Sequence, residues 1–91
     1  MKNRLEGYSV LIVDDDPDIL ASFTIAMKAE GAATLEATDG TAAIAACMAH
    51  SPDAMILDMM LPKRSGFLVL EELQNLEDPP LVIMVTANEG K

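Results

Sequence analysis

Basic residues, aromatic residues and cysteine are all scarce in this 91-residue chain. Six lysines and arginines stand against fifteen aspartates and glutamates, which gives a net charge of −9. Domains that bind nucleic acid need basic surface, so this charge argues against such a domain. The single cysteine, Cys47, excludes an internal disulfide and fits a reducing compartment. With no tryptophan, one tyrosine and two phenylalanines, the hydrophobic 51% of the chain is mostly aliphatic and methionine side chains.

Long apolar runs are also absent. No run approaches the ~20 apolar residues that span a membrane. Lys2 and Arg4 precede an apolar run that aspartates interrupt too soon for a signal peptide. We therefore expect a cytoplasmic protein without a membrane segment. Residues 1–91 are expected to form a single small domain, because this length supports one core.

Short apolar runs alternate with helical patterns along the chain. The runs that predict strands are Val10–Val13, Thr34–Ala37, Ala54–Leu57 and Leu81–Val85, and the patterns that predict helices are Asp18–Glu30, Thr41–His50 and Gly66–Leu76. This alternation predicts parallel strands joined by right-handed crossovers. Because Thr34–Ala37 is the least apolar strand, we place it at an edge, in the strand order 2-1-3-4. The predicted fold class is α/β, a doubly wound parallel sheet.

The helical patterns also predict which side chains face the core and where the first helix begins. The expected inward-facing residues are Ile19, Leu20, Phe23, Ala26 and Met27 in the first helix and Phe67, Leu70 and Leu73 in the third. Asp16 is expected to cap the first helix, and Pro17 suits its first turn. Gly31 is placed to end that helix.

Acidic and hydroxyl side chains follow three of the predicted strands. Asp14 and Asp15 come after the first strand, Asp58 after the third and Thr86 after the fourth. In this sheet the carboxyl ends of those strands meet where ligands bind in open α/β folds. Two unit charges ~4 Å apart repel by roughly 4 kcal/mol at an effective dielectric constant of about 20. The cluster therefore requires a proton or a cation.

The chemistry of these side chains indicates a particular kind of site. Carboxylates, a backbone carbonyl and waters are hard oxygen ligands, which favour Mg²⁺ or Mn²⁺ over zinc. One carboxylate could act as a nucleophile towards phosphorus and form an aspartyl phosphate. The Thr86 hydroxyl could then donate a hydrogen bond to a phosphoryl oxygen.

Four segments, taken in order and with their spacing, resemble the receiver domain of bacterial two-component response regulators. They are VLIVDDDPD (10–18), EATDGTAAI (36–44), MILDMMLPKRSG (55–66) and VIMVTAN (82–88). The resemblance covers the chain from Tyr8 onward. It implies a flavodoxin-like fold, and a histidine kinase or phosphotransfer protein as the phosphoryl donor.

The resemblance also implies a role for each residue of the predicted site. Asp58 is the expected phosphoacceptor, and Asp14, Asp15 and Asp58 are the expected ligands of Mg²⁺. The backbone carbonyl of Met60 would be a further metal ligand. Thr86 would be the hydroxyl that binds the phosphoryl group.

The family pattern continues beyond the segments found here. A fourth helix, a fifth strand and a fifth helix are expected to be lacking, so we predict a receiver truncated after the fourth strand. We also expect the lysine that pairs with the phosphoryl group in this family to be lacking, because Lys91 lies too close to Thr86 to be that residue. Leu81–Val85 has no polar alternation, so it would form an exposed apolar edge. We expect a homodimer through this strand and the face left bare by the missing last helix.

Two other functional classes remain open. A pseudo-receiver would act as an interaction and dimerisation module and never carry phosphate. A phosphohydrolase of the haloacid-dehalogenase type would use Asp14 and Asp16 as its Asp-x-Asp motif, but it needs a downstream lysine and acidic pair. We expect a signalling phosphoacceptor and not an enzyme acting on other substrates.

Overall fold

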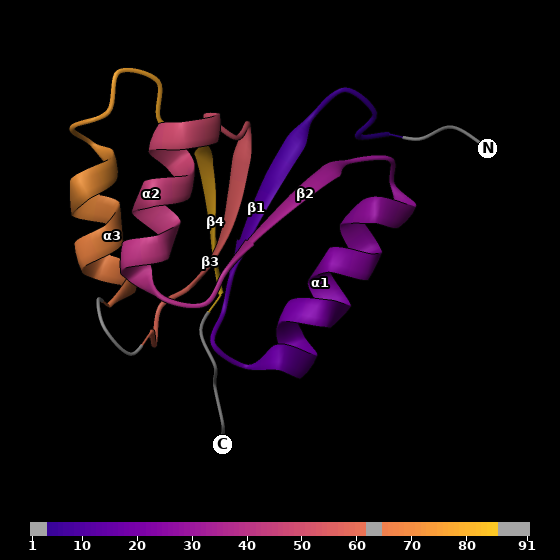
Figure 1. The fold of residues 1–91 in the computed structure, drawn as a ribbon, viewed down its shortest axis with the longest axis horizontal. Helices are drawn as coiled ribbons and strands as arrows, with labels where there is room; N and C mark the ends of the chain where they lie inside the picture. Colours follow the sequence, from indigo (N-terminus) through magenta and orange to yellow (C-terminus); the bar gives the residue numbers. More distant parts are fainter. Residues whose placement is uncertain (1–3, 62–64, 86–91) are drawn as a thin grey trace.

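The computed structural model describes residues 4–61 and 65–85 of the chain. The elements follow one another as β1 (Ser9–Val13), α1 (Pro17–Ala29), β2 (Ala33–Ala37), α2 (Gly40–His50), β3 (Ala54–Asp58), α3 (Gly66–Leu73) and β4 (Leu81–Val85). The strands pair in parallel in the order β2-β1-β3-β4. Figure 1 shows α1 on one face of the sheet and α2 and α3 on the other. The predicted α/β class and the strand order 2-1-3-4 are confirmed.

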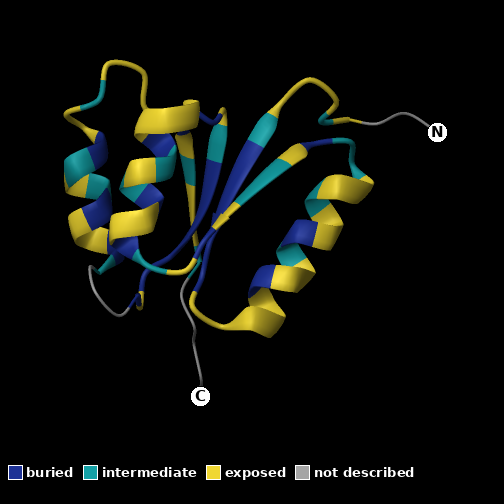
Figure 2. Cartoon of the chain, in the orientation of Figure 1, coloured by how far each residue is buried: buried dark blue, intermediate teal, exposed yellow. Residues whose placement is uncertain are grey.

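The apolar strands form the middle layer of the molecule. β1 and β3 are buried along nearly their whole length, whereas the two outer strands are more exposed (Figure 2). Successive side chains of β1 and β3 point to opposite faces of the sheet, so they contribute to two core clusters, one under each helical layer. The larger cluster packs against α2 and α3, and the smaller one, on the α1 side, is built from Val10, Ile12, Leu20, Ala32 and Ile56.

The ends of α1 are set by the residues that the sequence singled out. Asp16 is the N-cap, and its carboxylate accepts hydrogen bonds from the N–H groups of Asp18 and Ile19 at 2.9 and 3.4 Å. Gly31 follows the helix with a φ of 95° and donates its N–H to the carbonyl of Lys28. Both predictions about this helix are confirmed. Within residues 4–61 and 65–85, no helix is long and apolar enough to cross a membrane.

The predicted inner stripe of α3 was wrong at Phe67, which is 72% exposed. The buried positions are Gly66, Val69 and Leu73, and the helix ends at Leu73 and not at Leu76. Because Gly66 lies directly against Met59, the backbone contact sets the rotation of the helix and turns Phe67 towards solvent. The expectations for Leu70 and Leu73 are confirmed, since both pack in the cluster under α2 and α3.

The stripe of α1 also differs from the expectation. Leu20 is buried and Phe23 and Met27 pack against the same cluster, but Ile19 and Ala26 are exposed. Thr24 is buried in their place. Its hydroxyl donates a 2.9 Å hydrogen bond to the Glu36 carboxylate on β2, which removes the cost of burying a polar group.

β4 forms the last strand of the sheet and pairs only with β3 among the residues described. Leu81, Ile83 and Met84 are 71%, 51% and 56% exposed. The predicted apolar edge strand is therefore present in the described part of the chain.

Candidate functional site

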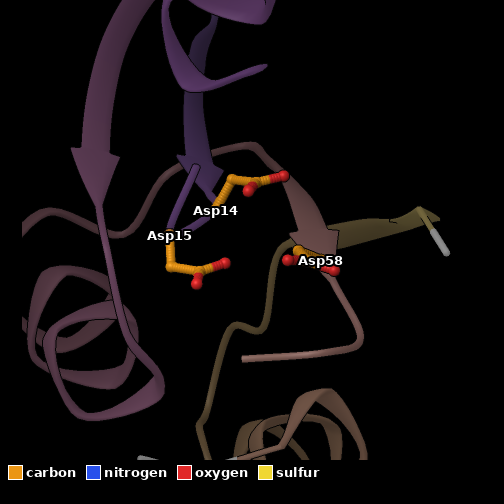
Figure 3. Close-up of side chains that lie close together, drawn as sticks. All are labelled: Asp14, Asp15 and Asp58. Atoms are coloured by element: carbon orange, nitrogen blue, oxygen red, sulfur yellow. The ribbon is translucent and has the colours of Figure 1, made fainter. Parts of the chain in front are cut away.

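The parallel register brings two aspartates together at the carboxyl edge of the sheet. Val13 of β1 pairs with Leu57 of β3, so the next residues, Asp14 and Asp58, leave neighbouring strands side by side. Asp15 follows in the loop that leads to α1. Carboxylate oxygens of the three residues lie within 4.8 Å of one another, and Figure 3 shows the three side chains converging from β1 and β3.

Each of the two strand-end aspartates is held by a backbone N–H two residues further on. An oxygen of the Asp14 carboxylate accepts from the N–H of Asp16 at 2.9 Å. Asp58 Oδ1 accepts from the N–H of Met60 at 3.0 Å. These bonds fix the orientation of both carboxylates before any ligand arrives.

The end of β4 lies beside Asp58 and helps to hold it. Asp58 pairs in register with Val85, and the N–H of Met59 donates to the Val85 carbonyl at 3.1 Å. The segment after Asp58 is thus tied to the end of β4. The N–H of Asp14 donates to the Ala37 carbonyl on β2, also at 3.1 Å. Hydrogen bonds to the flanking strands therefore hold both aspartates in place.

The cluster combines burial with like charge. Asp14 and Asp58 are buried, at 5% and 6% exposure, whereas Asp15 is exposed. Burial raises the pKa of the Asp14 carboxyl, and the negative charges of Asp58, Asp15 and Asp16 raise it further. The hydrogen bond from the Asp16 N–H acts in the opposite direction and lowers the pKa of Asp14.

The carboxylates line a cavity of about 260 Å³. Its walls are formed by Asp14, Asp15, Asp16, Ile19, Asp58, Met60 and Val85. A water takes up about 30 Å³ in the liquid, so this volume accommodates an ion together with several ligand oxygens. A donor set made only of carboxylate oxygens fits a hard divalent cation such as Mg²⁺.

The structure brings together three of the residues predicted from the sequence, Asp14, Asp15 and Asp58. Met60 lines the same cavity. Thr86 lies outside the described residues, so its expected role stays a prediction. Sequence reasoning missed the apolar walls Ile19 and Val85. Ile19 lies in the first turn of α1, close in sequence to Asp14 and Asp15. Val85 directly precedes Thr86. The short distance along the sequence from the predicted site residues could therefore have pointed to both.

Comparison with known proteins decides the family. The sequence model of one protein family, the response regulator receiver domain, matches residues 10–91 of this chain. The chain belongs to this family. Among curated relatives, this receiver is 42% identical over 83 residues to the probable transcriptional regulatory protein TcrX of Mycobacterium tuberculosis, covering 90% of this chain and 35% of TcrX. It is 36% identical over 75 residues to the transcriptional regulatory protein KdpE of the same species, covering 82% of this chain and 33% of KdpE.

Solved structures of other receiver domains have the same fold as this receiver. The N-terminal domain of a response regulator receiver protein from Methanoculleus marisnigri JR1 matches with a TM-score of 0.85 and 28% identity, over 94% of this chain and 72% of that chain. The receiver domain of the response regulator NarL from Mycobacterium tuberculosis matches with a TM-score of 0.83 and 30% identity, over 93% and 70% of the two chains. The receiver spans about a third of the length of the curated relatives it matches.

Proposed function

We propose that Asp58 accepts a phosphoryl group in two-component signalling, with Mg²⁺ bound by the carboxylates of Asp14, Asp15 and Asp58. The observation that carries this proposal is the convergence of the three carboxylates at the strand ends of a receiver domain. When bound, Mg²⁺ supplies the positive charge that neutralises the acids and the phosphoryl oxygens. The Met60 backbone carbonyl and the Thr86 hydroxyl complete the proposed set of contacts.

The hydrogen bond from the Met60 N–H makes the two oxygens of Asp58 different from each other, which supports a proposal about which of them reacts. Oδ1 accepts the Met60 N–H, so Oδ2 is the oxygen proposed to attack phosphorus. The new bond joins Oδ2 to phosphorus, and the bond between phosphorus and the donor's imidazole nitrogen breaks. The electron pair of that bond leaves with the imidazole, which takes up a proton.

The proposed donor is the phosphohistidine of a histidine kinase or phosphotransfer protein. Support comes from the family, whose curated relatives are named as transcriptional regulators and response regulators. The proposed location is the cytoplasm. We propose no nucleic-acid contact through these residues, because their net charge is −9. A second copy of the chain is a further proposed partner, because the apolar side chains of β4 are exposed.

The phosphoacceptor proposal is tested by labelling the chain with acetyl phosphate and measuring the intact mass. We expect the mass of one phosphoryl group to be added in Mg²⁺ and not in EDTA. Asp58→Asn should abolish the label. Asp78→Asn is the matched control, because Asp78 is an exposed aspartate lining a cavity that shares no residue with the acidic one. A folded chain that binds Mg²⁺ but takes no label would instead support the pseudo-receiver.

We also propose that the chain is not an enzyme acting on other substrates. The phosphohydrolase alternative predicts continuous release of phosphate from a generic ester such as p-nitrophenyl phosphate. We expect no turnover above that of Asp58→Asn. Sustained turnover that needs Asp14 and Asp16 would contradict the receiver proposal and restore the phosphohydrolase.

A further inference from the structure

The outward face of α2 is uncharged. The helix carries no aspartate, glutamate, lysine or arginine along Gly40–His50. Its exposed residues are Thr41, Ala42, Ala45, Met48, Ala49 and His50. The largest apolar side chain among them, that of Met48, is 69% exposed. A helix at a protein surface usually turns charged side chains to solvent and apolar ones to the core. The outward face of α2 therefore resembles a face that packs against another surface.

A cavity of about 290 Å³ adjoins this face at the C-terminal end of α2. Its lining residues are Cys47, Met48, Ser51, Leu76, Glu77 and Asp78. Three of them offer apolar side chains, and the two acids are exposed. The C-terminus of a helix adds partial negative charge from its last carbonyl groups. The cavity therefore combines an apolar wall with negative charge, which fits an apolar side chain that has a lysine or arginine beside it.

The described residues from α2 onward contain no lysine or arginine. Within 40–61 and 65–85 every aspartate and glutamate therefore faces a surface without a basic side chain of those two types. Arg4 and Lys28, the lysine and arginine of the described chain, lie outside this layer: Arg4 precedes β1, and Lys28 is in the last turn of α1, on the opposite face of the sheet (Figure 1). A partner that approaches α2 thus meets negative charge around an apolar surface. Charge complementarity calls for a basic partner.

This surface lies away from the end of β4. α2 packs on β1, β2 and α3, whereas β4 forms the edge of the sheet opposite β2. β4 ends beside Asp58, at the carboxyl edge of the sheet. The cavity lies between the C-terminal end of α2 and the segment after α3, at the amino edge where the next strands begin. The last described residue is therefore at the far end of the sheet from this surface.

We propose that α2 and the cavity at its C-terminal end bind a basic amphipathic helix of a partner protein. The apolar side of the partner helix lies along α2, where the small side chains of Ala42 and Ala45 allow close approach. One of its apolar side chains enters the cavity beside Met48, and its lysines or arginines face Glu77 and Asp78. Burial of apolar surface supplies the affinity, as in other helix-in-groove complexes. The opposite charges set the orientation and speed association.

A labelled synthetic peptide tests this surface, a helix with leucines on one side and lysines on the other. Fluorescence anisotropy should show saturable binding to the 91-residue chain in moderate salt, which screens the net charge of −9. Met48→Asp places a charge in the apolar contact and should weaken binding about tenfold or more. Ile25→Asp is the matched control, because Ile25 is also 69% exposed but lies on α1, and the change in net charge is the same. Absence of saturable binding overturns the proposal, as does equal weakening by the two variants.

The acidic side of the cavity is tested by Glu77→Gln, which should lower the affinity about two- to fivefold and reduce its salt dependence. Glu6→Gln is the matched control, because Glu6 is an exposed glutamate before β1. Equal effects of the two variants would show a general attraction to net charge and overturn the proposal.

Chemical-shift mapping locates the peptide on the wild-type chain, so it holds even if Met48→Asp fails to fold. The backbone amide signals that shift should be concentrated in α2 and in residues 76–78. Shifts concentrated in α1 overturn the proposal. If no peptide binds and Met48→Asp instead dissociates a dimer in sedimentation velocity, the surface pairs with a second copy and the proposed partner is wrong. Phosphorylation at Asp58 enters none of these measurements.

Discussion

The carboxylates of Asp14 and Asp58 lie within 4.8 Å of each other although they belong to different strands, and both are buried. Two ionised carboxylates in this arrangement repel, and burial removes the water that would weaken the repulsion. The raised pKa of Asp14 has these two causes, with burial the larger. The folded chain therefore carries an electrostatic cost that a bound divalent cation would relieve.

Replacing Asp14 with asparagine should stabilise the metal-free protein at neutral pH. Because the pKa of Asp14 is raised on folding, its ionisation lowers the free energy of unfolding as pH rises from its ordinary value of 3.8 through the folded pKa. Asp14→Asn removes this loss and keeps a side-chain oxygen for the Asp16 N–H. Each kcal/mol gained corresponds to about 4–8 °C in melting temperature. Thermal unfolding in EDTA should show a gain that shrinks as pH falls towards 3.8, and a variant that melts lower at neutral pH would contradict it.

Magnesium should reverse the order of these two proteins. At a concentration about 100 times its dissociation constant, a ligand that binds only the folded state adds about 2.7 kcal/mol to the free energy of unfolding. We expect wild type to melt higher with Mg²⁺ than in EDTA, and Asp14→Asn to respond weakly. An equal response of the two proteins in a titration followed by melting temperature would count against the carboxylate cluster as the metal site.

Asp16 should act as a helix cap and not as a required metal ligand. Its carboxylate accepts hydrogen bonds from the N–H groups of Asp18 and Ile19 in the first turn of α1. Asp16→Ala should therefore lower the free energy of unfolding by about 0.5–2 kcal/mol. Asp16→Asn retains the cap and should cost less. Titration with Mg²⁺ monitored by calorimetry should give similar affinities for wild type and Asp16→Asn, and loss of binding in that variant would assign Asp16 to the metal.

The elements of this fold were predictable where burial on both faces dictates the residue types. β4 has the predicted bounds, and the other strands begin or end within one residue of them, because pairs such as Ser9 with Ala33 extend the ladder. The acids of the site were predictable because parallel strands deliver their ends to one edge. The rotation of α3 was not, since its sequence offers two apolar stripes and the buried one is the stripe that brings Gly66 against Met59. Thr24 illustrates the same limit, because its burial depends on Glu36 of β2.

Gly66 should be required for both stability and the geometry of Asp58. A Cβ at this position would lie 2.6 Å from Met59 Cα and 2.6 Å from Met59 Sδ. Gly66→Ala must move Met59, which precedes the Met60 N–H that holds Asp58. We expect a loss of about 1–3 kcal/mol in the free energy of unfolding, together with weaker Mg²⁺ binding.

Gly7→Ala separates these two effects. Gly7 has a φ of 90° but open space around it, so alanine there strains the backbone by about 1–2 kcal/mol without a steric clash. Its Mg²⁺ affinity should equal that of wild type. Denaturant unfolding and metal titration of the two variants measure this, and unchanged metal affinity in Gly66→Ala would show that Met59 moves without disturbing Asp58.

Cys47 should be unreactive in the folded protein. The side chain is 3% exposed, and burial raises the pKa of its thiol. A colourimetric thiol reagent should modify it only as fast as the chain unfolds, and much faster in denaturant. Rapid modification of the native protein would mean that α2 opens more readily than its packing indicates.

The unequal size of the two core clusters has a consequence for local opening. α1 rests on the smaller cluster, so its amide hydrogens should exchange with solvent sooner than those of α2. Asp14 and Asp15 lead directly into α1, and opening of the helix would separate them from Asp58. A cation that bridges the three carboxylates would then oppose this opening of α1. The slowing of amide exchange by Mg²⁺ should be concentrated in this helix.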